Sequence, residues 1–298
     1  MPELPEVEIT ARNIRRWGEG RLIERVRTDV RAARIFRPGD RGAFARAIAG
    51  ARFVQVDRRG KHLLVTLEDR RGRPLGLWSH LGMTGKWVWR AATDPAPPHS
   101  RARLDLDDGH ALHYLDPRLF GRLRTVAGAD FAAVPDIGAL GPDPVHDGID
   151  PDRLGDRLRA TRRAVKVALL DQAVLAGVGN IHASESLFAA RIDPRRRGRS
   201  LSAEEVRRIA RAIAASLRRG IESQEGPEIA YVEEPGAENP FRVYARAGER
   251  CPRCRVHEIQ RIVQAQRSTF FCPGCQDVSR EPRRVSRARR VRRARPGA

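Results

Sequence analysis

Residues 174–186 read VLAGVGNIHASES, a helical pattern interrupted by two glycines. Gly177 and Gly179 permit a tight turn, and Asn180 stands where its side chain can cap a following helix. Exposed backbone N–H groups at a helix start also bind phosphate, and the Asn180 amide could add a donor. An ordinary helix hairpin would give the same pattern, but the basic flanks RATRRAVK and RIDPRRRGR favour a phosphate-binding turn.

Helices are predicted on both sides of this turn, from about residue 151 to residue 221. The clearest one, SAEEVRRIARAIAASLRRG, begins with a capping box of Ser202 and Glu205 and is predicted to end at Gly220. Its apolar face holds Val206, Ile209, Ile213 and Leu217. The sequence therefore predicts a helical domain over residues 153–240.

The amino-terminal part reads mainly as strands, after a helix from about Pro5 to Trp17. ARFVQVDRRGKHLLVTLED alternates apolar and polar positions around a turn at Arg59-Gly60, and RLDLDDGHALHYLD reads as a second hairpin. Several short strands with few helices predict a sandwich or barrel over residues 1–135. The Pro-, Gly- and Asp-rich residues 136–152 are the predicted linker to the helical domain.

The 298-residue chain is long enough for two domains and carries a formal net charge of +20. Such a basic surface attracts polyanions, and nucleic acid is the leading candidate. No apolar run approaches the ~20 residues that cross a membrane, and no signal-peptide pattern is present, so a cytoplasmic protein without a membrane partner is predicted. Only three of the 57 basic residues are lysines: Lys61, Lys86 and Lys166.

The chain begins MPELPEVE, which places acids beside its own amino terminus. Pro5 suits the first turn of a helix, and Glu6 would face the positive end of the helix dipole. Pro2 and Glu3 precede that helix. Removal of Met1 would leave Pro2 as a secondary amine that can attack an aldehyde carbon, and Glu3 could move the protons. This stretch alone favours an ordinary helix start, so other segments must decide.

All the cysteines lie near the carboxyl terminus, in CPRC and CPGC motifs separated by seventeen residues. Paired two-residue spacings suit tetrahedral zinc, whereas disulfides are typical of exported chains. Because four Cys ligands leave no open position, one structural Zn²⁺ is predicted. Its ligands are Cys251, Cys254, Cys272 and Cys275. The metal would hold a hairpin within residues 241–276 whose tip, AQRST, presents Arg267 outward.

Two segments with Gly-bounded tips carry apolar side chains: Met83 in SHLGMTG, and Phe120 beside Arg118 in DPRLFG. Proteins that extrude a base need an apolar wedge and a donor for the vacated space, although hairpin packing explains either segment alone. Lys61, in RRGKHLL, is predicted to start a strand directly after a turn. An ammonium there suggests proton transfer or a grip on one phosphate.

Together these segments resemble, in order and spacing over residues 2–275, the formamidopyrimidine-DNA glycosylase/endonuclease VIII family of base-excision repair enzymes. The resemblance implies an α+β fold of two lobes. One would be an N-terminal β-sandwich with an N-terminal helix, and the other a C-terminal helix–two-turn–helix domain with a zinc-binding β-hairpin. It implies a monomeric, nucleoid-associated glycosylase and lyase that acts on double-stranded DNA containing damaged bases.

The same resemblance implies a role for each matched residue. Pro2 would be the Schiff-base nucleophile at the sugar C1′, and Glu3 the proton carrier that opens the ribose. Lys61 would contact phosphate and assist elimination, while Arg267 would clamp phosphate and aid a second elimination. The remaining matched residues would contact DNA: His80, His99, Arg162 and Asn180 at the backbone, and Met83, Arg118 and Phe120 in the space left by the flipped base.

The trio of Met83, Arg118 and Phe120 resembles the formamidopyrimidine branch and implies oxidised purines, such as 8-oxoguanine and formamidopyrimidines, as substrates. The segment ESQEGPEIAYVEEPGAENP, residues 222–240, departs from that branch, with six glutamates and no threonine. An acidic loop should sit poorly against DNA unless it folds away or recognises something other than phosphate. Two alternatives therefore stay open: an endonuclease VIII-like enzyme for oxidised pyrimidines, and an idle DNA-binding protein.

Residues 277–298 hold nine arginines against two acids and almost nothing to bury, so a disordered tail is predicted. The arginines should add nonspecific affinity for DNA. Deleting residues 278–298 is then expected to flatten the dependence of DNA affinity on salt, because fewer counterions are released on binding. Titrations of duplex DNA over a range of salt concentrations measure this slope, and an unchanged slope would contradict the prediction.

Overall fold

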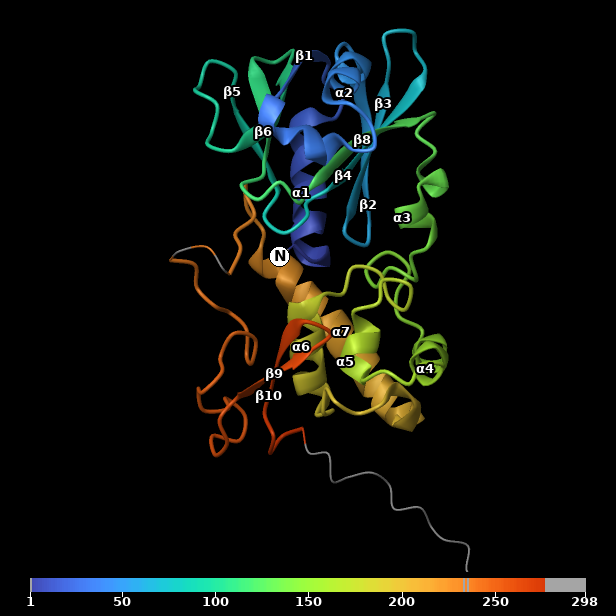
Figure 1. The fold of residues 1–298 in the computed structure, drawn as a ribbon, viewed down its shortest axis with the longest axis vertical. Coiled ribbons are helices and arrows are strands. Elements are labelled where there is room, and N and C mark those ends of the chain that lie inside the picture. Colours follow the sequence, from blue (N-terminus) through green and yellow to red (C-terminus); the bar gives the residue numbers. More distant parts are fainter. Residues whose placement is uncertain (1, 233, 235, 277–298) are drawn as a thin grey trace, which may run out of the picture.

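The computed structural model describes residues 2–232, 234 and 236–276 of the chain, which form the two lobes seen in Figure 1. The arginine-rich tail predicted at 277–298 lies outside the described residues. Strands dominate one lobe and helices the other, as the α+β prediction requires. The amino terminus lies at the junction between the two lobes (Figure 1).

The strand-rich lobe is built from helix α1 and two antiparallel sheets of four strands. Helix α1 is Leu4–Gly18, close to the predicted span. One sheet has the order β1-β6-β7-β5, with β1 Ile23–Thr28, β6 Ser100–Leu106, β7 His110–Leu115 and β5 Lys86–Ala91. The other has the order β2-β3-β4-β8, with β2 Arg52–Arg59, β3 His62–Glu68, β4 Pro74–His80 and β8 Arg122–Ala127. Helix α1 lies between the sheets (Figure 1), and the sandwich prediction is confirmed.

Short helices fill the connections of this lobe. They are η1 Val30–Phe36, α2 Arg41–Ile48, η2 Phe131–Ala133 and α3 Pro135–Gly138. The first predicted hairpin pairs Arg59 with His62, so its turn is Gly60-Lys61. The prediction that Lys61 starts the strand is therefore wrong by one residue, because Gly60, with φ +56°, and Lys61 together make the turn.

Four helices form the second lobe: α4 Pro151–Arg159, α5 Val165–Leu169, α6 Asn180–Ala190 and α7 Ala203–Ser223, with a 3-10 turn, η3, at Gly198–Ser200. Two consecutive turns separate α5 from α6, which confirms the helix–two-turn–helix expectation. The predicted capping box of Ser202 and Glu205 is present at α7. The predicted stop at Gly220 is wrong. Gly220 is internal to α7, where a Cβ would lie 2.8 Å from Pro5, so it permits close packing of α1.

The remaining strands form the hairpin of β9 Gln260–Gln264 and β10 Arg267–Phe271. Ala265 and Gln266 both adopt positive φ, which makes a tight two-residue turn. The buried carboxylate of Glu185, on α6, accepts hydrogen bonds from the backbone N–H groups of residues 242–244. These bonds attach the chain that leads into the hairpin to the helical lobe.

One continuous apolar core includes buried side chains of both lobes, from Leu4 on α1 to Leu217 on α7. The lobes therefore meet through packed side chains as well as through the connecting segment. Within the described residues, no helix has both the length and the apolar character to span a membrane.

Candidate active site

A cleft of about 500 Å³ lies where the two lobes and the hairpin meet. Five residues predicted from separate sequence segments line it: Glu3, Met83, Arg118, Asn180 and Arg267. Pro2 is buried directly beside Glu3. Tertiary folding thus collects the amino terminus, both Gly-bounded loops, the start of α6 and the tip of the hairpin at one place.

The Glu3 carboxylate caps helix α6 across the junction between the lobes. Its oxygens accept the backbone N–H groups of Gly179, Ile181 and His182 at 3.0, 2.7 and 3.1 Å. A Cβ on Gly179 would lie 2.3 Å from the Glu3 Cδ, so only glycine allows this approach. The N–H groups of Gly179, Ile181 and His182 are therefore occupied by Glu3, so the prediction that backbone N–H groups of this turn bind phosphate is wrong. The phosphate contact predicted for the Asn180 side chain stays a prediction.

Asn180 is the first residue of α6 and does not cap it, because Gly179 holds the N-cap position. The Asn180 amide instead donates to the Ser268 carbonyl of the hairpin at 2.9 Å, and its carbonyl oxygen accepts from the Lys166 ammonium. Lys166 is fully buried. Burial lowers the pKa of Lys166 to about 8, with the negative charge of Glu3 opposing the shift and the positive charge of Arg267 adding to it.

Lys61 lies close enough to the cleft to interact with its charged groups. Burial lowers the pKa of Lys61, the negative charges of Glu3 and Glu6 oppose this shift, and Arg267 adds to it. A lowered pKa makes the neutral amine more accessible near neutral pH, as a group that exchanges protons requires.

Glu6 is a buried acid whose carboxylate accepts the Glu3 backbone N–H at 2.8 Å. Burial and the like charge of Glu3 raise the pKa of Glu6 from 4.5 to about 7. Folding therefore favours the protonated form, and the resulting stability is lost as the pH rises through 7. The substitution Glu6→Gln mimics that form, so it should raise the free energy of unfolding at pH 8 by up to about 3 kcal/mol and change little near pH 4.5.

Thermal or urea unfolding at the two pH values measures this difference. Glu8→Gln is the matched control. Although burial alone would raise the pKa of Glu8, hydrogen bonds and charges from Arg58 and Arg12 lower it, so this substitution should destabilise the protein at pH 8. Equal effects of the Glu6→Gln substitution at both pH values would contradict the prediction.

The two Gly-bounded loops are joined through Asp116. Its buried carboxylate accepts from the Thr84 hydroxyl at 3.1 Å and from the Arg118 and Gly121 backbone N–H groups at 3.2 and 2.8 Å. This carboxylate therefore places the Met83 loop beside the Arg118 loop. Phe120 is 43% exposed, and the guanidinium groups of Arg118 and Arg34 lie 5.0 and 5.2 Å from its ring centroid.

The other predicted DNA contacts, His80, His99 and Arg162, do not line the cleft. His80 Nδ1 accepts the Gly82 N–H at 3.1 Å. Burial, with the nearby His62 and Lys61, lowers the pKa of His80 to about 3, so the ring is neutral and Nε2 carries the proton. His99 and Arg162 are exposed. Their roles stay predictions.

The described residues of the acidic segment 222–240, which are 222–232, 234 and 236–240, fold back against the strand-rich lobe. The Tyr231 hydroxyl donates to the Gly85 carbonyl at 2.6 Å, and Lys86 pairs with Glu234 at 3.3 Å. Tyr231, Lys86 and Glu234 also line the cleft. Three of its glutamates pair with cations of the protein: Glu225 with Arg12, Glu228 with Arg90 and Glu234 with Lys86. These pairs hold the negative charge against the protein, as the expectation that the segment folds away requires.

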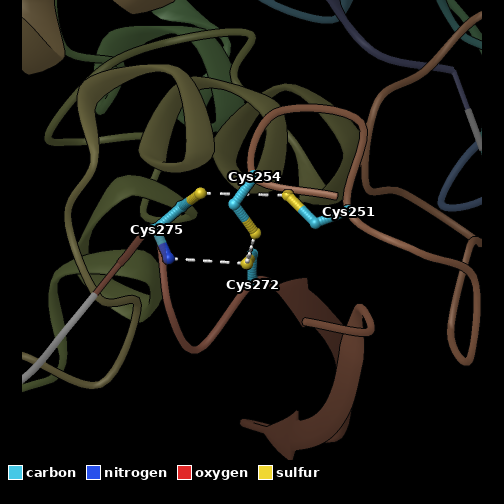
Figure 2. A group of neighbouring side chains, drawn as sticks. All are labelled: Cys251, Cys254, Cys272 and Cys275. Carbon is cyan, nitrogen blue, oxygen red and sulfur yellow. Dashed lines mark hydrogen bonds between the residues drawn. The ribbon is translucent and has the colours of Figure 1, made fainter. Parts of the chain in front are cut away.

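The four cysteine sulfurs lie within 4.8 Å of one another. Figure 2 shows the four side chains gathered at one place. Burial raises the pKa of the Cys272 thiol to about 12 and also raises that of Cys275, so these two thiolates need a cation that neutralises them. The cluster has the donor set of a structural Zn²⁺ site. When bound, the metal joins the segment before β9 to the end of β10 and so holds the hairpin that carries Arg267 and Ser268.

Lys86, Lys166, Tyr231 and Glu234 are cleft or cleft-supporting residues for which the sequence predicted no role. The scarcity of lysine was a usable signal for Lys86 and Lys166, since the argument applied to Lys61 holds equally for both. Nothing in the local sequence marks Tyr231, because its hydroxyl partner is 146 residues away.

Comparisons with known proteins agree with this geometry. Models of the formamidopyrimidine-DNA glycosylase N-terminal domain, the formamidopyrimidine-DNA glycosylase H2TH domain and a zinc finger found in FPG and IleRS match residues 1–123, 140–229 and 248–278. The formamidopyrimidine-DNA glycosylase of Desulfitobacterium hafniense is 38% identical, covering 93% of this chain and all of the relative. That of Symbiobacterium thermophilum is 39% identical, covering all of this chain and 94% of the relative.

Two solved structures extend the comparison. The MutM (Fpg) protein of Thermus thermophilus has a TM-score of 0.75 and 39% identity, with 92% of this chain and 98% of that chain covered. The Lactococcus lactis Fpg in complex with DNA containing an oxidised pyrimidine has a TM-score of 0.82 and 28% identity, with 93% of this chain and 100% of that chain covered. The chain therefore belongs to the formamidopyrimidine-DNA glycosylase family of base-excision repair enzymes.

Proposed function

We propose that this glycosylase is also an AP lyase that removes oxidised purines from duplex DNA through a Schiff base at Pro2. The supporting observation is the position of Glu3, whose carboxylate is held by three backbone N–H groups at the start of α6 while lining the cleft. A carboxylate fixed there, one residue from a potential free amine, suits proton transfer to a sugar bound in the cleft.

In this mechanism the Pro2 nitrogen lone pair attacks C1′, and the base leaves with the electrons of the glycosidic bond. The nitrogen, now bonded to C1′, loses its proton, which balances the proton that the departing base takes up. The lone pair freed in this way forms an iminium as the C1′–O4′ bond breaks, and Glu3 delivers the proton that O4′ acquires. Loss of the C2′ proton allows the 3′ phosphate to depart. Lys61 and Arg267 would hold phosphate near these atoms, and their positive charges would stabilise the leaving group.

The remaining predicted residues are assigned to the DNA. Asn180 would position a flanking phosphate, with Lys166 setting its orientation. Met83, Arg118 and Phe120 would occupy the space vacated by the extruded nucleotide. The exposed Arg162 and His99 would contact other backbone phosphates. The formal charge of +20 would add attraction to DNA of any sequence.

Borohydride trapping tests the proposal. The purified protein is mixed with a duplex containing 8-oxoguanine opposite cytosine, and a covalent protein–DNA product is expected. A second candidate substrate is an oxidised pyrimidine, because the Lactococcus lactis relative was solved with DNA containing one. Matched duplexes with each lesion and with an abasic site separate the two. Trapping on the abasic duplex alone would contradict the purine specificity, and no trapping on any duplex would contradict the lyase.

A further inference from the structure

The acidic segment is fastened to the strand-rich lobe at several separate points. Asn13 on α1 donates to the Gly226 carbonyl at 2.9 Å, and Tyr231 donates to Gly85 at 2.6 Å. Ile229 and Tyr231 are 3% and 6% exposed and belong to the common core. The described part of the segment therefore has a defined place beside the Met83 loop.

Two ion pairs join this segment to one face of β5. Lys86 and Arg90 are four residues apart on the strand, so their side chains point to the same side. Lys86 pairs with Glu234 at 3.3 Å, and Arg90 pairs with Glu228. The two pairs differ in location, because Lys86 and Glu234 line the cleft whereas Arg90 and Glu228 do not.

We infer that the Lys86–Glu234 pair, positioned by Tyr231, determines which base the cleft accepts. The inference rests on the proposed function. A carboxylate in this cleft repels phosphate, so it suits a neutral group such as an extruded base. The ammonium donates hydrogen bonds and the carboxylate accepts them, so the pair selects a ring that presents a carbonyl oxygen next to an N–H.

8-Oxoguanine has this arrangement at its C8–N7 edge and guanine does not, so we place that edge, and not the C6–N1 edge that both bases share, against the pair. In 8-oxoguanine the C8 carbonyl lies beside N7–H, so the carbonyl can accept from Lys86 while N7–H donates to Glu234. In guanine N7 is an acceptor and C8 carries hydrogen, so the same pose would set a lone pair against the carboxylate. A site built to hydrogen-bond a donor rejects a ligand that lacks it, since its own polar group is then left unpaired.

The test compares two substitutions in the full chain, Glu234→Ala and Glu228→Ala. Each removes one glutamate that pairs the segment with β5, but only Glu234 lines the cleft. Single-turnover excision from an 8-oxoguanine:cytosine duplex is measured beside borohydride trapping on an abasic duplex, which has no base to read. We expect Glu234→Ala to slow excision at least about tenfold and to leave abasic trapping within about twofold. Glu228→Ala should leave both within about twofold of wild type.

A second variant, Lys86→Met, keeps the length of the side chain and removes the hydrogen-bond donor. It should likewise slow excision of 8-oxoguanine while leaving abasic trapping within about twofold. Excision at the wild-type rate in both Glu234→Ala and Lys86→Met would overturn the inference. So would an equal fall in excision and in abasic trapping, which would show that the pair only supports the fold. Failure of the wild-type protein to trap abasic DNA would instead overturn the proposed lyase, and the inference with it.

Discussion

A chain that keeps Met1 should form no covalent complex with abasic DNA. In that chain the Pro2 nitrogen is part of an amide, so its lone pair is delocalised and it cannot attack C1′. Loss of the nucleophile is expected to lower trapping by roughly 1,000-fold or more, as in other enzymes that work through a covalent intermediate. The processed and unprocessed chains, separated by mass, are compared by borohydride trapping under identical conditions.

Binding separates this effect from misfolding. Both chains should bind a duplex with an uncleavable abasic analogue with affinities that agree within about threefold, because the cleft residues and the zinc hairpin are unchanged. Thermal unfolding should likewise be similar. Efficient trapping by the unprocessed chain would assign the nucleophile to another amine near the cleft, with Lys61 and Lys166 as the candidates, since burial lowers the pKa of both.

Removal of zinc should abolish DNA binding as well as activity. The hairpin contributes Arg267 and Ser268 to the cleft, and the Ser268 carbonyl accepts from Asn180 at 2.9 Å. Structural zinc sites supply roughly 10–16 kcal/mol of binding free energy in small peptides, so the hairpin should unfold without the metal. Cys272→Ser is expected to lower the affinity for the abasic analogue by about 100-fold or more.

Zinc content by mass spectrometry, the thermal midpoint and the DNA affinity are measured together. Val256→Ala is the matched control, because this 76%-exposed side chain lies between the two cysteine pairs without being a ligand. It should leave all three quantities unchanged. A Cys272→Ser protein that loses zinc yet binds DNA normally would show that the hairpin holds its shape through packing of residues such as Phe270 and Phe271, which are also buried.

The sequence predicted secondary structure well where the stabilising interaction joins residues a few positions apart. The capping box at Ser202 depends on a residue three positions away, and the apolar face of α7 depends on helical spacing, so both are visible in the sequence. The cysteine spacing similarly predicted a tetrahedral metal site from two short motifs, and the cluster of four sulfurs confirms it. The stop at Gly220 failed because a glycine that ends a helix and one that admits a neighbouring helix look identical in sequence.

In the cleft, too, the sequence indicated the residues but not their interaction partners. Pro2, Glu3, Asn180 and Arg267 could be named from motifs, but their partners could not. Glu3 reads locally as an acid ahead of a helix, whereas its carboxylate caps a different helix whose first N–H donor is 176 residues away. The prediction that backbone N–H groups at the start of that helix bind phosphate failed because those groups donate to the Glu3 carboxylate.

By itself the sequence determined the two lobes, the zinc ligands and the residue types able to perform amine chemistry, because each depends on spacing within one segment. Tertiary structure alone decided that the α6 cap comes from Glu3, that Lys166 orients Asn180, and that Glu228 and Glu234 lie against cations of β5. A hydrogen bond or ion pair forms only between groups that lie about 3 Å apart. Residues distant in the sequence reach that separation only when the common core packs the two lobes together.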